Sequence, residues 1–508
     1  MTFFFLLNPW ALSGQPAPLD STFGINGIVS FQYGFSSLLR DMELLPDGKI
    51  LIAGGSPSEI YLARFNPDGS MDNSFGVNGI SVNAVTENVA PHGDLVVQPD
   101  GKIISIGEAI DIASPFQTRM FAVFRYNPNG VLDSTFGQSG MVTTKFSQFY
   151  ASGFIGALQP DGKILAVGQA NLGSGLRFAW ARYHPEGKID STFSDNGYTT
   201  LPTGGNGLPT CTVVLADGKI LTGGTEVING TRFLINRLLP NGIVDSTFGV
   251  NGKFSEWFGN YYEVVQSMAI LPDGKILGAG WVGGGPGGGA VFFRLSPNGS
   301  LDPTFGNNGL LIINSGGVST NNEIDLMPNG KIVATGAGHS PSVGADVAYV
   351  MRFHPNGSFD NSFNSTGLGT IIAGTATGGD NQIIQPDGKI LISGYYYPSD
   401  TLPPQIMLAR VLNDGLNAAH APTFIRQCSI SPNPSKGLVT LRYEIERPLD
   451  ISIKIYDMSG RCALTVVTQK NCPTGENIEY FDTSRLPSGH YQIMIESQLG
   501  ATSLQLVK

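Results

Sequence analysis

Arginine and aspartate recur at a fixed spacing in this sequence. An Arg precedes an Asp by eight residues in six successive places: Arg64 and Asp72, Arg125 and Asp133, Arg182 and Asp190, Arg237 and Asp245, Arg294 and Asp302, Arg352 and Asp360. A seventh arginine, Arg410, has no Asp at this distance, and Asp20, the first Asp of the series, has no Arg before it. If these residues form ion pairs in a closed ring, Arg410 must meet Asp20. If the spacing only reflects a repeat, both side chains of each pair stay in solvent.

Aromatic residues gather in a few segments between the apolar runs. They are Trp257, Tyr261 and Tyr262, then Trp281 beside a glycine-rich stretch, then Tyr395, Tyr396 and Tyr397. Exposed aromatic rings in loops could stack on sugar rings, whereas the alternative is that they pack within their own loops. We treat them as a tentative ligand-binding set.

Acidic residues lie in the same segments, but the sequence assigns them no partner. They are Glu59, Glu108, Asp111, Glu226, Glu256, Asp346 and Asp400. Two carboxylates facing one cleft would suit glycoside cleavage, whereas solvated loop acids are the default. The six His are scattered, and the Asn-Pro-Asp-Gly turns lack the bidentate acid of a calcium loop. We therefore predict no metal site, no cofactor and no catalytic residue.

The residues above sit within a repeat that covers most of the chain. An Asp-Ser-Thr-Phe-Gly box, called the box below, opens at Asp20, Asp72, Asp133, Asp190, Asp245, Asp302 and Asp360, with a mean period of about 57 residues. Each box precedes an apolar stretch, a Pro-Asp-Gly-Lys turn and a second apolar run that ends in Arg. A period of this length indicates a propeller or a solenoid.

Each repeat contains four short β-rich runs and no helical periodicity. In the first repeat they cover residues 27–31, 39–45, 49–53 and 60–65, with a tight turn at Pro46-Asp47-Gly48. Seven four-stranded antiparallel units are best closed as a seven-bladed β-propeller, because closure removes exposed sheet edges. In that fold each Arg–Asp pair would join neighbouring blades.

The box and the turn resemble the delta-60 repeat family, whose units form β-propeller blades. The resemblance covers residues 19–415, with departures at Pro303, Ser194 and Asn364 that remain compatible with turns. The family carries no established activity. It does imply two unlike faces: the Pro-Asp-Gly-Lys turns and the box connections lie on a uniform face, and the other loops lie on a variable face with the aromatic residues.

Composition excludes several classes of protein. The chain has 508 residues, 41% of them apolar, with 67 Gly, 32 Pro and a net charge of −10. A nucleic-acid partner is not expected without a basic stripe, and no apolar run is long enough for a membrane span. Residues 1–15 are typical of a secretory signal peptide cleaved near Ser13 or Gly14, although the apolar run is short and lacks a preceding basic residue. The alternative is an apolar N-terminus that packs on the first blade.

The repeat ends near Gly415, and a different module follows a linker at residues 416–427. Residues 428–508 alternate polar and apolar positions, as in a small β-sandwich. Ser431-Pro432-Asn433-Pro434, Tyr456-Asp457-Met458-Ser459-Gly460 and Leu486-Pro487-Ser488-Gly489 resemble the motifs of the C-terminal sorting domain of the type IX secretion system of Bacteroidota. The resemblance implies export by that machinery, removal of the module by its C-terminal signal peptidase, and release or attachment at the cell surface. An ordinary accessory β-domain is the alternative.

Four cysteines fit an oxidising compartment without requiring bonds. Cys462 and Cys472 could pair across a hairpin, and Cys211 lies in an apolar strand and is expected in the core.

Taken together, these features predict an all-β protein: a seven-bladed propeller of four-stranded blades followed by a small C-terminal β-sandwich. We favour a secreted or surface-attached binding module with a glycan or protein ligand over an enzyme. The alternatives are an extracellular polysaccharide hydrolase or lyase that uses loop carboxylates, and a structural surface or adhesion protein.

Overall fold

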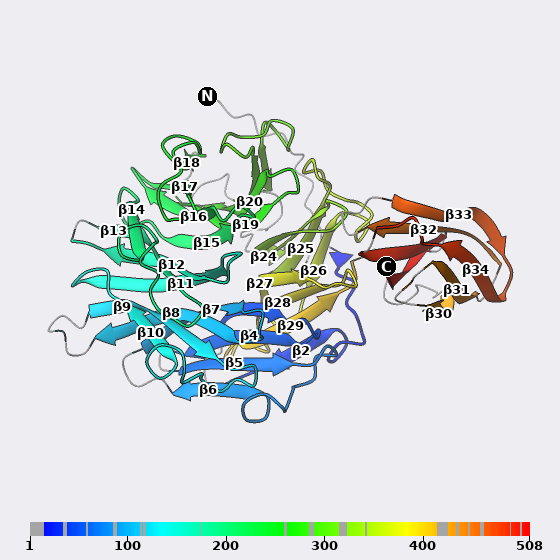
Figure 1. Cartoon of the computed structure of the whole chain (residues 1–508), viewed down its shortest axis with the longest axis horizontal. Coiled ribbons are helices and arrows are strands. Elements are labelled where there is room, and N and C mark those ends of the chain that lie inside the picture. The colour runs from blue at the N-terminus through cyan, green and yellow to red at the C-terminus, as the bar shows by residue number, and fades with distance from the viewer. Residues whose placement is uncertain are drawn as a thin grey trace. The chain divides into compact units, whose positions relative to one another are not determined.

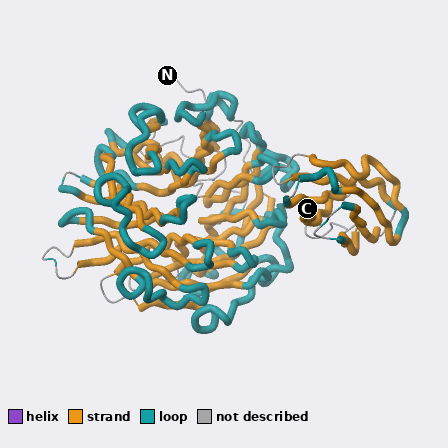
Figure 2. The backbone as a smooth tube through the Cα atoms, in the orientation of Figure 1, coloured by secondary structure: helices purple, strands orange, loops and turns teal. Residues whose placement is uncertain are grey.

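The computed structural model describes residues 15–508 except for a number of loops. The positions left out of this span are 34–37, 57–58, 85–88, 112–113, 115–117, 174, 259–261, 284–288, 314–322, 341–342, 414–424, 433–434, 436, 446–447, 458–461, 488 and 498–499. Every regular element in the described part is a β-strand (Figure 2). No helix there is both long and apolar enough to cross a membrane. The predicted signal peptide, residues 1–15, lies outside the described residues except for Gln15.

Seven sheets form the blades of a propeller (Figure 1). Blade 1 consists of β3 (Leu38–Leu44), β4 (Ile50–Ser56), β5 (Glu59–Phe65) and β6 (Ile80–Ala84). Blade 2 consists of β7 (Val89–Val97), β8 (Ile103–Asp111), β9 (Thr118–Tyr126) and β10 (Met141–Thr144). Blade 3 consists of β11 (Tyr150–Leu158), β12 (Ile164–Asn171), β13 (Leu176–Tyr183) and β14 (Tyr198–Pro202). Blades 4 and 5 consist of β15 (Pro209–Val214), β16 (Ile220–Val227), β17 (Thr231–Leu238) and β18 (Lys253–Glu256); and β19 (Tyr262–Ile270), β20 (Ile276–Gly283), β21 (Gly289–Leu295) and β22 (Leu310–Ile313).

The last two blades take strands from both ends of the propeller sequence. Blade 6 consists of β23 (Glu323–Leu326), β24 (Ile332–Ser340), β25 (Ala345–Phe353) and β26 (Leu368–Ile371), with β1 (Gln15–Pro16) added in parallel beside β26; blade 7 consists of β27 (Ala376–Ile384), β28 (Ile390–Tyr397), β29 (Gln405–Val411) and β2 (Ile28–Phe31). The first strand of each blade contacts the first strand of the next, and β27 contacts β3. The propeller is therefore a closed ring of seven blades.

The repeat of the sequence and the blade of the structure are out of phase by one strand. The strand after each box was expected to begin a blade, and this expectation is wrong: β6 follows the second box and pairs with β5 as the outermost strand of blade 1. The box itself is the cause, because its backbone turns sharply. The Phe75 amide donates to the Asp72 carbonyl at 3.1 Å, and the Gly79 amide donates to the Phe75 carbonyl at 2.9 Å, which returns the chain alongside β5.

The turn between the first two strands of a blade follows its residue types. In blade 1 the Leu45 amide donates to the Lys49 carbonyl at 2.8 Å, and Gly48 adopts a φ of 81°, which a residue with a Cβ rarely takes. The Lys49 amide also donates to the Asp47 side chain at 3.2 Å. These local bonds fix the register of the hairpin that contains the innermost strand of the blade. The innermost strands of the seven blades line the central channel of the ring.

Most channel-lining strands contain a β-bulge. The register shifts between Leu39 and Asp41 in β3, and equivalent shifts occur in β7, β11, β15, β19 and β27. A bulge bends the strand and redirects the following side chain. It also selects glycine on the partner strand, because a Cβ on Gly168 would overlap the Ser152 carbonyl oxygen. The bulges therefore turn polar side chains toward the centre of the ring.

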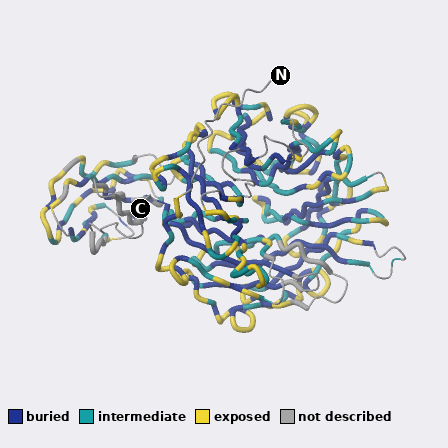
Figure 3. Tube along the Cα trace, turned by 180° about the vertical axis from the view of Figure 1, so that it is seen from behind, coloured by how far each residue is buried: buried dark blue, intermediate teal, exposed yellow. Residues whose placement is uncertain are grey.

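The core of the propeller lies between the blades. Buried strand residues fill the sheets, and exposed residues concentrate in the loops (Figure 3). The Phe of every box is almost fully buried: Phe23, Phe75, Phe136, Phe193, Phe248, Phe305 and Phe363 are at most 1% exposed. Each box therefore packs its ring into the core and also turns the chain.

The structure divides into two compact units, Met1–Leu326 with Ile332–Asn413, and Asp414–Lys508 with Met327–Lys331. The C-terminal unit is a sandwich of two sheets. One contains β30 (Ile425–Ser431), β31 (Leu438–Ile445) and β34 (Gly475–Asp482); the other contains β33 (Cys462–Cys472), β32 (Leu449–Asp457), β35 (His490–Ser497) and β36 (Gly500–Val507). Val439, Leu441, Ile453 and Ile493 are fully buried in its core.

The suggested pairing of Cys462 with Cys472 is wrong. Both residues lie on the single strand β33, one at each end, so an extended backbone of roughly 3.3 Å per residue holds them far apart. Cys472 is a buried free thiol in hydrogen-bond contact with the Tyr443 hydroxyl at 3.3 Å. Cys211 is also free, and it packs against the core of blades 4 and 5 as expected.

Candidate functional site

Each box builds a clamp with the arginine of its own blade. In blade 1 the Arg64 Nε lies 2.7 Å from the Asp72 Oδ2, and its guanidinium carbon lies 4.6 Å from the centre of the Phe75 ring. The Ser74 hydroxyl donates to the other carboxylate oxygen at 2.6 Å. The remaining arm, Nη1, donates to the Pro128 carbonyl of blade 2 at 2.6 Å. One side chain thus ties a box to its strand and to the next blade.

The same clamp occurs seven times, and we call the set the clamp ring. The Arg–Asp distances are 2.7–2.9 Å, and the Arg–Phe distances are 4.5–5.1 Å. The pairs include Arg64 with Asp72 and Arg125 with Asp133. The ion pairs lie within a sheet, so the expectation that they join neighbouring blades is wrong, because the box hairpin folds Asp back onto its own blade. The contact between blades is the bond from Nη1 to a turn carbonyl.

Arg410 and Asp20 form the pair that closes the ring. The Arg410 Nε lies 2.9 Å from the Asp20 Oδ2, and its Nη1 donates to the Pro67 carbonyl of blade 1 at 2.6 Å. Burial raises the pKa of Asp20, but hydrogen bonds from Thr22 and Lys389 and the Arg410 charge outweigh that effect and lower it to about 2. Asp20 is therefore ionised at neutral pH. Residues 390 positions apart are joined as tightly as the internal pairs.

Aromatic residues form a first exposed platform at the variable-loop end of blade 5. The Tyr262 and Trp281 rings stack with centroids 5.9 Å apart and an interplanar angle of 10°. Tyr262 is 59% exposed, and Trp257 in the preceding loop is 51% exposed. Tyr261 and most of the glycine-rich stretch lie outside the described residues. The structure therefore brings two of the predicted aromatic residues into one platform.

A second platform lies at the end of β28 in blade 7. Tyr395 and Tyr397 are two positions apart on one strand, so they share a face, and their rings meet edge to face at 6.1 Å. Both are exposed. Tyr396 points the other way, and its hydroxyl is held by Ser30 at 2.6 Å and Gln405 at 2.7 Å. Tyr396 thus holds blade 7 to its outer strand and is unavailable as a platform.

The loop acids proposed from the sequence do not meet as carboxylate pairs among the described residues. Several of them contact a basic group instead: Glu108 with Arg119, Asp111 with Lys145, Glu226 with Lys253, and Asp346 with His339. Glu256 and Asp400 are exposed, and the Glu59 side chain lies outside the described residues. Arg119, Lys145 and Lys253 are cations at neutral pH and neutralise Glu108, Asp111 and Glu226, whereas His339 is a cation only when it is protonated.

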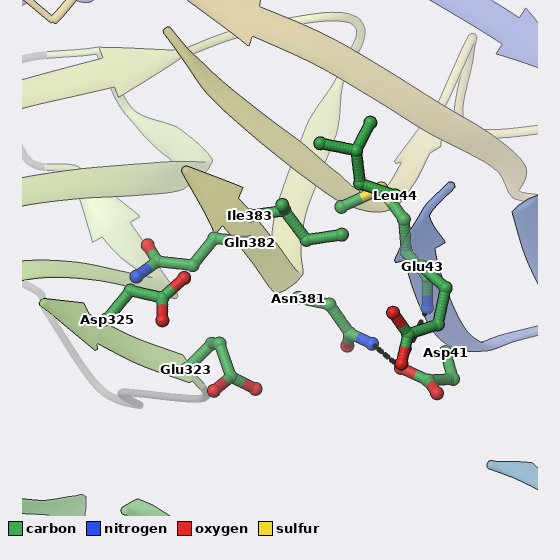
Figure 4. A pocket seen from close by; sticks show the side chains of 9 residues that line it. Asp41, Glu43, Leu44, Glu323, Asp325, Asn381, Gln382 and Ile383 are labelled. Carbon is green, nitrogen blue, oxygen red and sulfur yellow. Dashed lines mark hydrogen bonds between the residues drawn. The ribbon is translucent and has the colours of Figure 1, made fainter. Parts of the chain in front are cut away.

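Carboxylates do meet in the central channel, on strands and not on loops. A cavity of about 380 Å³ is lined by Asp41 and Glu43 of β3, by Glu323 and Asp325 of β23, and by part of β27. Figure 4 shows the two acidic pairs on opposite sides of Asn381, which donates to the Asp41 Oδ1 at 3.0 Å. Blades 1, 6 and 7 therefore place four acids around one space.

These acids hold protons more strongly than usual. Burial raises the pKa of Glu43 to about 8, with a further rise from the Asp41 charge. Burial also raises the pKa of Glu323 to about 8, against a hydrogen bond from Ser267. The pKa of Asp325 rises to about 6 by burial. At neutral pH the cavity thus holds protonated and ionised acids side by side.

The sequence did contain a signal for this cavity. Asp41-Met42-Glu43 and Glu323-Ile324-Asp325 each have two acids on alternate positions of a strand, at the same place in two repeats. Alternation puts both acids of each pair on one face of a strand. Strands were treated as scaffold and loops as the site of function, so the pattern was missed. Within the described residues, no group of three or more His, Cys, Asp or Glu is arranged to hold a metal ion.

Comparison with protein families identifies both parts of the chain. Residues 45–75, 98–136, 159–193, 215–248, 271–305 and 328–363 match the domain of unknown function (DUF5122) beta-propeller. Residues 429–508 match the secretion system C-terminal sorting domain. The chain is thus an array of these propeller repeats followed by a sorting domain, and both resemblances are confirmed. A seventh contiguous match is missing because blade 7 combines β27, β28 and β29 with the first box and β2.

The sorting domain also establishes the destination of the protein, which is secreted or attached to the outer-membrane surface. No curated protein sequence matches the chain.

Solved structures with similar folds share little sequence with the chain. A virginiamycin B lyase from Staphylococcus aureus is 12% identical, with 76% of this chain and 99% of that chain covered and a TM-score of 0.47. The polysaccharide lyase Uly1 is 11% identical, with 76% and 92% covered and a TM-score of 0.43. The β-propeller domain of the Trilobed protease from Pyrococcus furiosus is 10% identical, with 74% and 94% covered and a TM-score of 0.40. Similarity at this level carries no inference about function.

Proposed function

We propose that this exported propeller binds a glycan on its variable-loop face. The observation that carries the proposal is the stacked pair of Tyr262 and Trp281, which leaves Tyr262 59% exposed at the end of a rigid blade. Aromatic rings offer large apolar faces that hold their orientation at little entropic cost. Tyr395 and Tyr397 provide a second such surface on blade 7, on the same face of the propeller. Binding residues commonly lie on loops and strand ends that a rigid scaffold positions.

A glycan array probed with the full-length chain, with its C-terminal unit retained, tests this proposal. The double variant Tyr262→Ala and Trp281→Ala should lose binding with little change in melting temperature, because the exposed rings contribute little to the core. The variant Tyr480→Ala is the matched control, since Tyr480 is 63% exposed in the C-terminal unit. Unchanged binding by the double variant, or binding to proteins and to no glycan, would contradict the proposal.

A second candidate function is cleavage of a polysaccharide in the channel. It is favoured by the four acids around one cavity, where Glu43 and Glu323 have pKa values of about 8 and Asp325 of about 6. A protonated acid and an ionised base are the pair that glycoside cleavage requires. The chain would then combine aromatic binding at the surface with acid–base chemistry in the channel.

Turnover assays separate the two candidates. Any polysaccharide that binds is incubated with the protein, and new chain ends are measured. Cleavage that Glu323→Gln abolishes and the exposed control Glu476→Gln leaves intact would establish the enzyme. Binding without new chain ends supports the binding module alone.

The C-terminal unit contains the sorting signal for export. We infer that the type IX machinery removes this unit with its C-terminal signal peptidase. Deletion of residues 428–508 should leave a folded propeller in the periplasm, because within the part of the chain that the structure describes the clamp ring extends no further than Asn413. Cell fractionation with an antibody to the propeller measures the outcome. Normal arrival of the truncated chain at the surface would contradict this role.

A further inference from the structure

Two aspartates link three blades along the wall of the channel. Asp41 of blade 1 accepts the Leu95 amide of blade 2 through Oδ2 at 2.8 Å. Asp94 of blade 2 accepts the Gly156 amide of blade 3 through Oδ2 at 2.5 Å. Both residues follow the bulge of their strand, so the bulge aims each carboxyl group at the next blade. We call Asp41, Asp94 and the groups bonded to them the channel link.

The carboxyl groups of Asp41 and Asp94 lie close to each other, because the Asp41 Oδ2 is 2.8 Å from the amide nitrogen of Leu95, the residue that follows Asp94. A carboxylate can only accept hydrogen bonds, so two ionised groups side by side would repel each other with no bond between them. Two carboxyl groups that share one site therefore favour the state in which one of them carries a proton.

The hydrogen-bond donors around the pair decide which group keeps the proton. Asp41 accepts the Met42 amide at 2.7 Å, the Asn381 amide group at 3.0 Å and the Leu95 amide. Hydrogen bonds to a carboxylate favour its ionised form. Asp94 accepts one amide, from Gly156. Asp41 is therefore the carboxylate and Asp94 the acid that donates to it.

We propose that one proton held between Asp94 and Asp41 joins blades 1 and 2 on the channel wall, and that its loss at alkaline pH weakens the ring at this place. Deprotonation would replace a charge-assisted hydrogen bond by two like charges in contact. Asn381 extends the link to blade 7, so the same proton supports the seam where the ring closes. The channel link is thus a pH-sensitive element of the fold.

The charged groups around the link cannot replace the proton. Among the described residues, those of the neighbouring strands are Arg40 and Glu43 on β3, Glu323 and Asp325 on β23, and Asp380 on β27. Four of these five are acids. The one cation among them, Arg40, lowers the pKa values of Asp380 and Tyr61 against the effect of burial.

The pKa values agree with the donor count and set the direction of the pH effect. Burial raises the pKa of Asp94 well above its usual value, and the Asp41 and Glu43 charges raise it further. Burial raises the pKa of Asp41 to about 6 against its hydrogen bonds. A raised pKa means that the folded state holds more protons than the unfolded state, so stability falls as the pH rises. The loss begins above the usual pKa of an aspartate, near pH 4, and continues as the pH rises toward the raised pKa of Asp94.

The test compares thermal unfolding of the full-length protein and its Asp94→Asn variant between pH 4 and pH 9. Asparagine can donate to Asp41 and accept from Gly156 without a titratable proton. The variant should match the wild type near pH 4 and exceed its melting temperature at pH 9 by on the order of 3 °C, about the effect of one pKa unit. The Glu43→Gln variant reports separately on a neighbouring acid, and Asp217→Asn, on an exposed turn, should leave the alkaline slope unchanged.

An infrared difference spectrum provides a measurement that does not depend on how the variant folds. The wild-type protein at neutral pH should show the carbonyl band of protonated carboxylic acids, and titration to pH 9 should reduce it. Asp94→Asn should lower that band at neutral pH. No protonated acid in the wild type, or an alkaline loss of stability that is the same in wild type and Asp94→Asn, would overturn the proposal.

Discussion

The clamp ring and the channel link both contain aspartates beside a contact between blades, and these aspartates have opposite charge states. Asp20 in the clamp ring contacts Arg410 and Lys389, and its pKa falls to about 2. In the channel, burial and the Asp41 and Glu43 charges raise the pKa of Asp94. Burial acts in the same direction at both places. The difference shows that the partners of a buried acid, more than burial itself, decide whether it stabilises the fold as an ion or as an acid.

Charge reversal in the clamp ring should have the largest effect on stability. Asp20→Arg and Asp133→Arg should each lower the free energy of unfolding by ~3–5 kcal/mol, since each leaves a buried arginine without its partner and adds a like charge. Urea unfolding measures the effect. The exposed turn variant Asp217→Arg serves as the control. A much smaller loss at Asp20 than at Asp133 would mean that the ring is not closed by its two ends.

The two regions should also limit stability at opposite ends of the pH range. The lowered pKa of Asp20 gives a stabilisation that is complete above about pH 4 and is lost as the pH falls toward 2. The raised pKa values of the channel acids predict a loss that begins near pH 4 and continues to about pH 8. Thermal unfolding from pH 2 to pH 9 should therefore show a maximum near pH 4. A melting temperature that does not change on the alkaline side would contradict the role given to the channel acids.

Replacing a clamp arginine by lysine should lower the free energy of unfolding less than reversing a charge does. Arg294 contacts Asp302, Thr304 and the Pro355 carbonyl, and it lies over Phe305. Lysine cannot reproduce this planar set of donors, so Arg294→Lys should cost ~1.5–3 kcal/mol. Arg442→Lys, in an exposed pair with Glu476 at 3.1 Å, should change stability by ~0–1 kcal/mol. Equal effects of the two variants would mean that the clamp adds nothing beyond charge.

A neutral contact in the channel wall should have the smallest effect. The Thr335 hydroxyl of blade 6 donates to the Gln382 side chain of blade 7 at 2.6 Å. Thr335→Val keeps the shape and removes the bond, which should cost ~0.5–1.5 kcal/mol without changing the pH profile. A change in the alkaline slope would show that the neutral contacts and the channel acids act together.

Much of the fold could be predicted because the same sequence pattern recurs seven times. The box, the glycine turn and the Arg–Asp spacing defined the blades, and the unmatched Arg410 and Asp20 indicated where the ends meet. The order of strands within a blade could not be read in the same way. A strand that follows the box can pair forward or backward, and the hydrogen bonds of Asp72, Phe75 and Gly79 decide it.

The candidate site was predicted only in part. Exposed aromatic residues such as Tyr262 and Tyr395 could be expected on the variable loops, but the opposite direction of Tyr396 depends on Ser30, far away in sequence. The channel acids were missed because Asp41 and Glu323 are 282 positions apart in sequence (323 minus 41) and meet only when blade 6 approaches blade 1. Closure of the ring brings these groups together, and no local sequence pattern predicts that they meet.

A double-mutant cycle on Asp20 and Arg410 tests the closed ring most directly. Asp20→Arg should destabilise the propeller, and addition of Arg410→Asp should restore part of the loss, because the two side chains contact each other at 2.9 Å. The account predicts a coupling free energy clearly above the ~0.5 kcal/mol within which distant sites add. Purely additive losses for the two substitutions would contradict closure of the ring by its two ends.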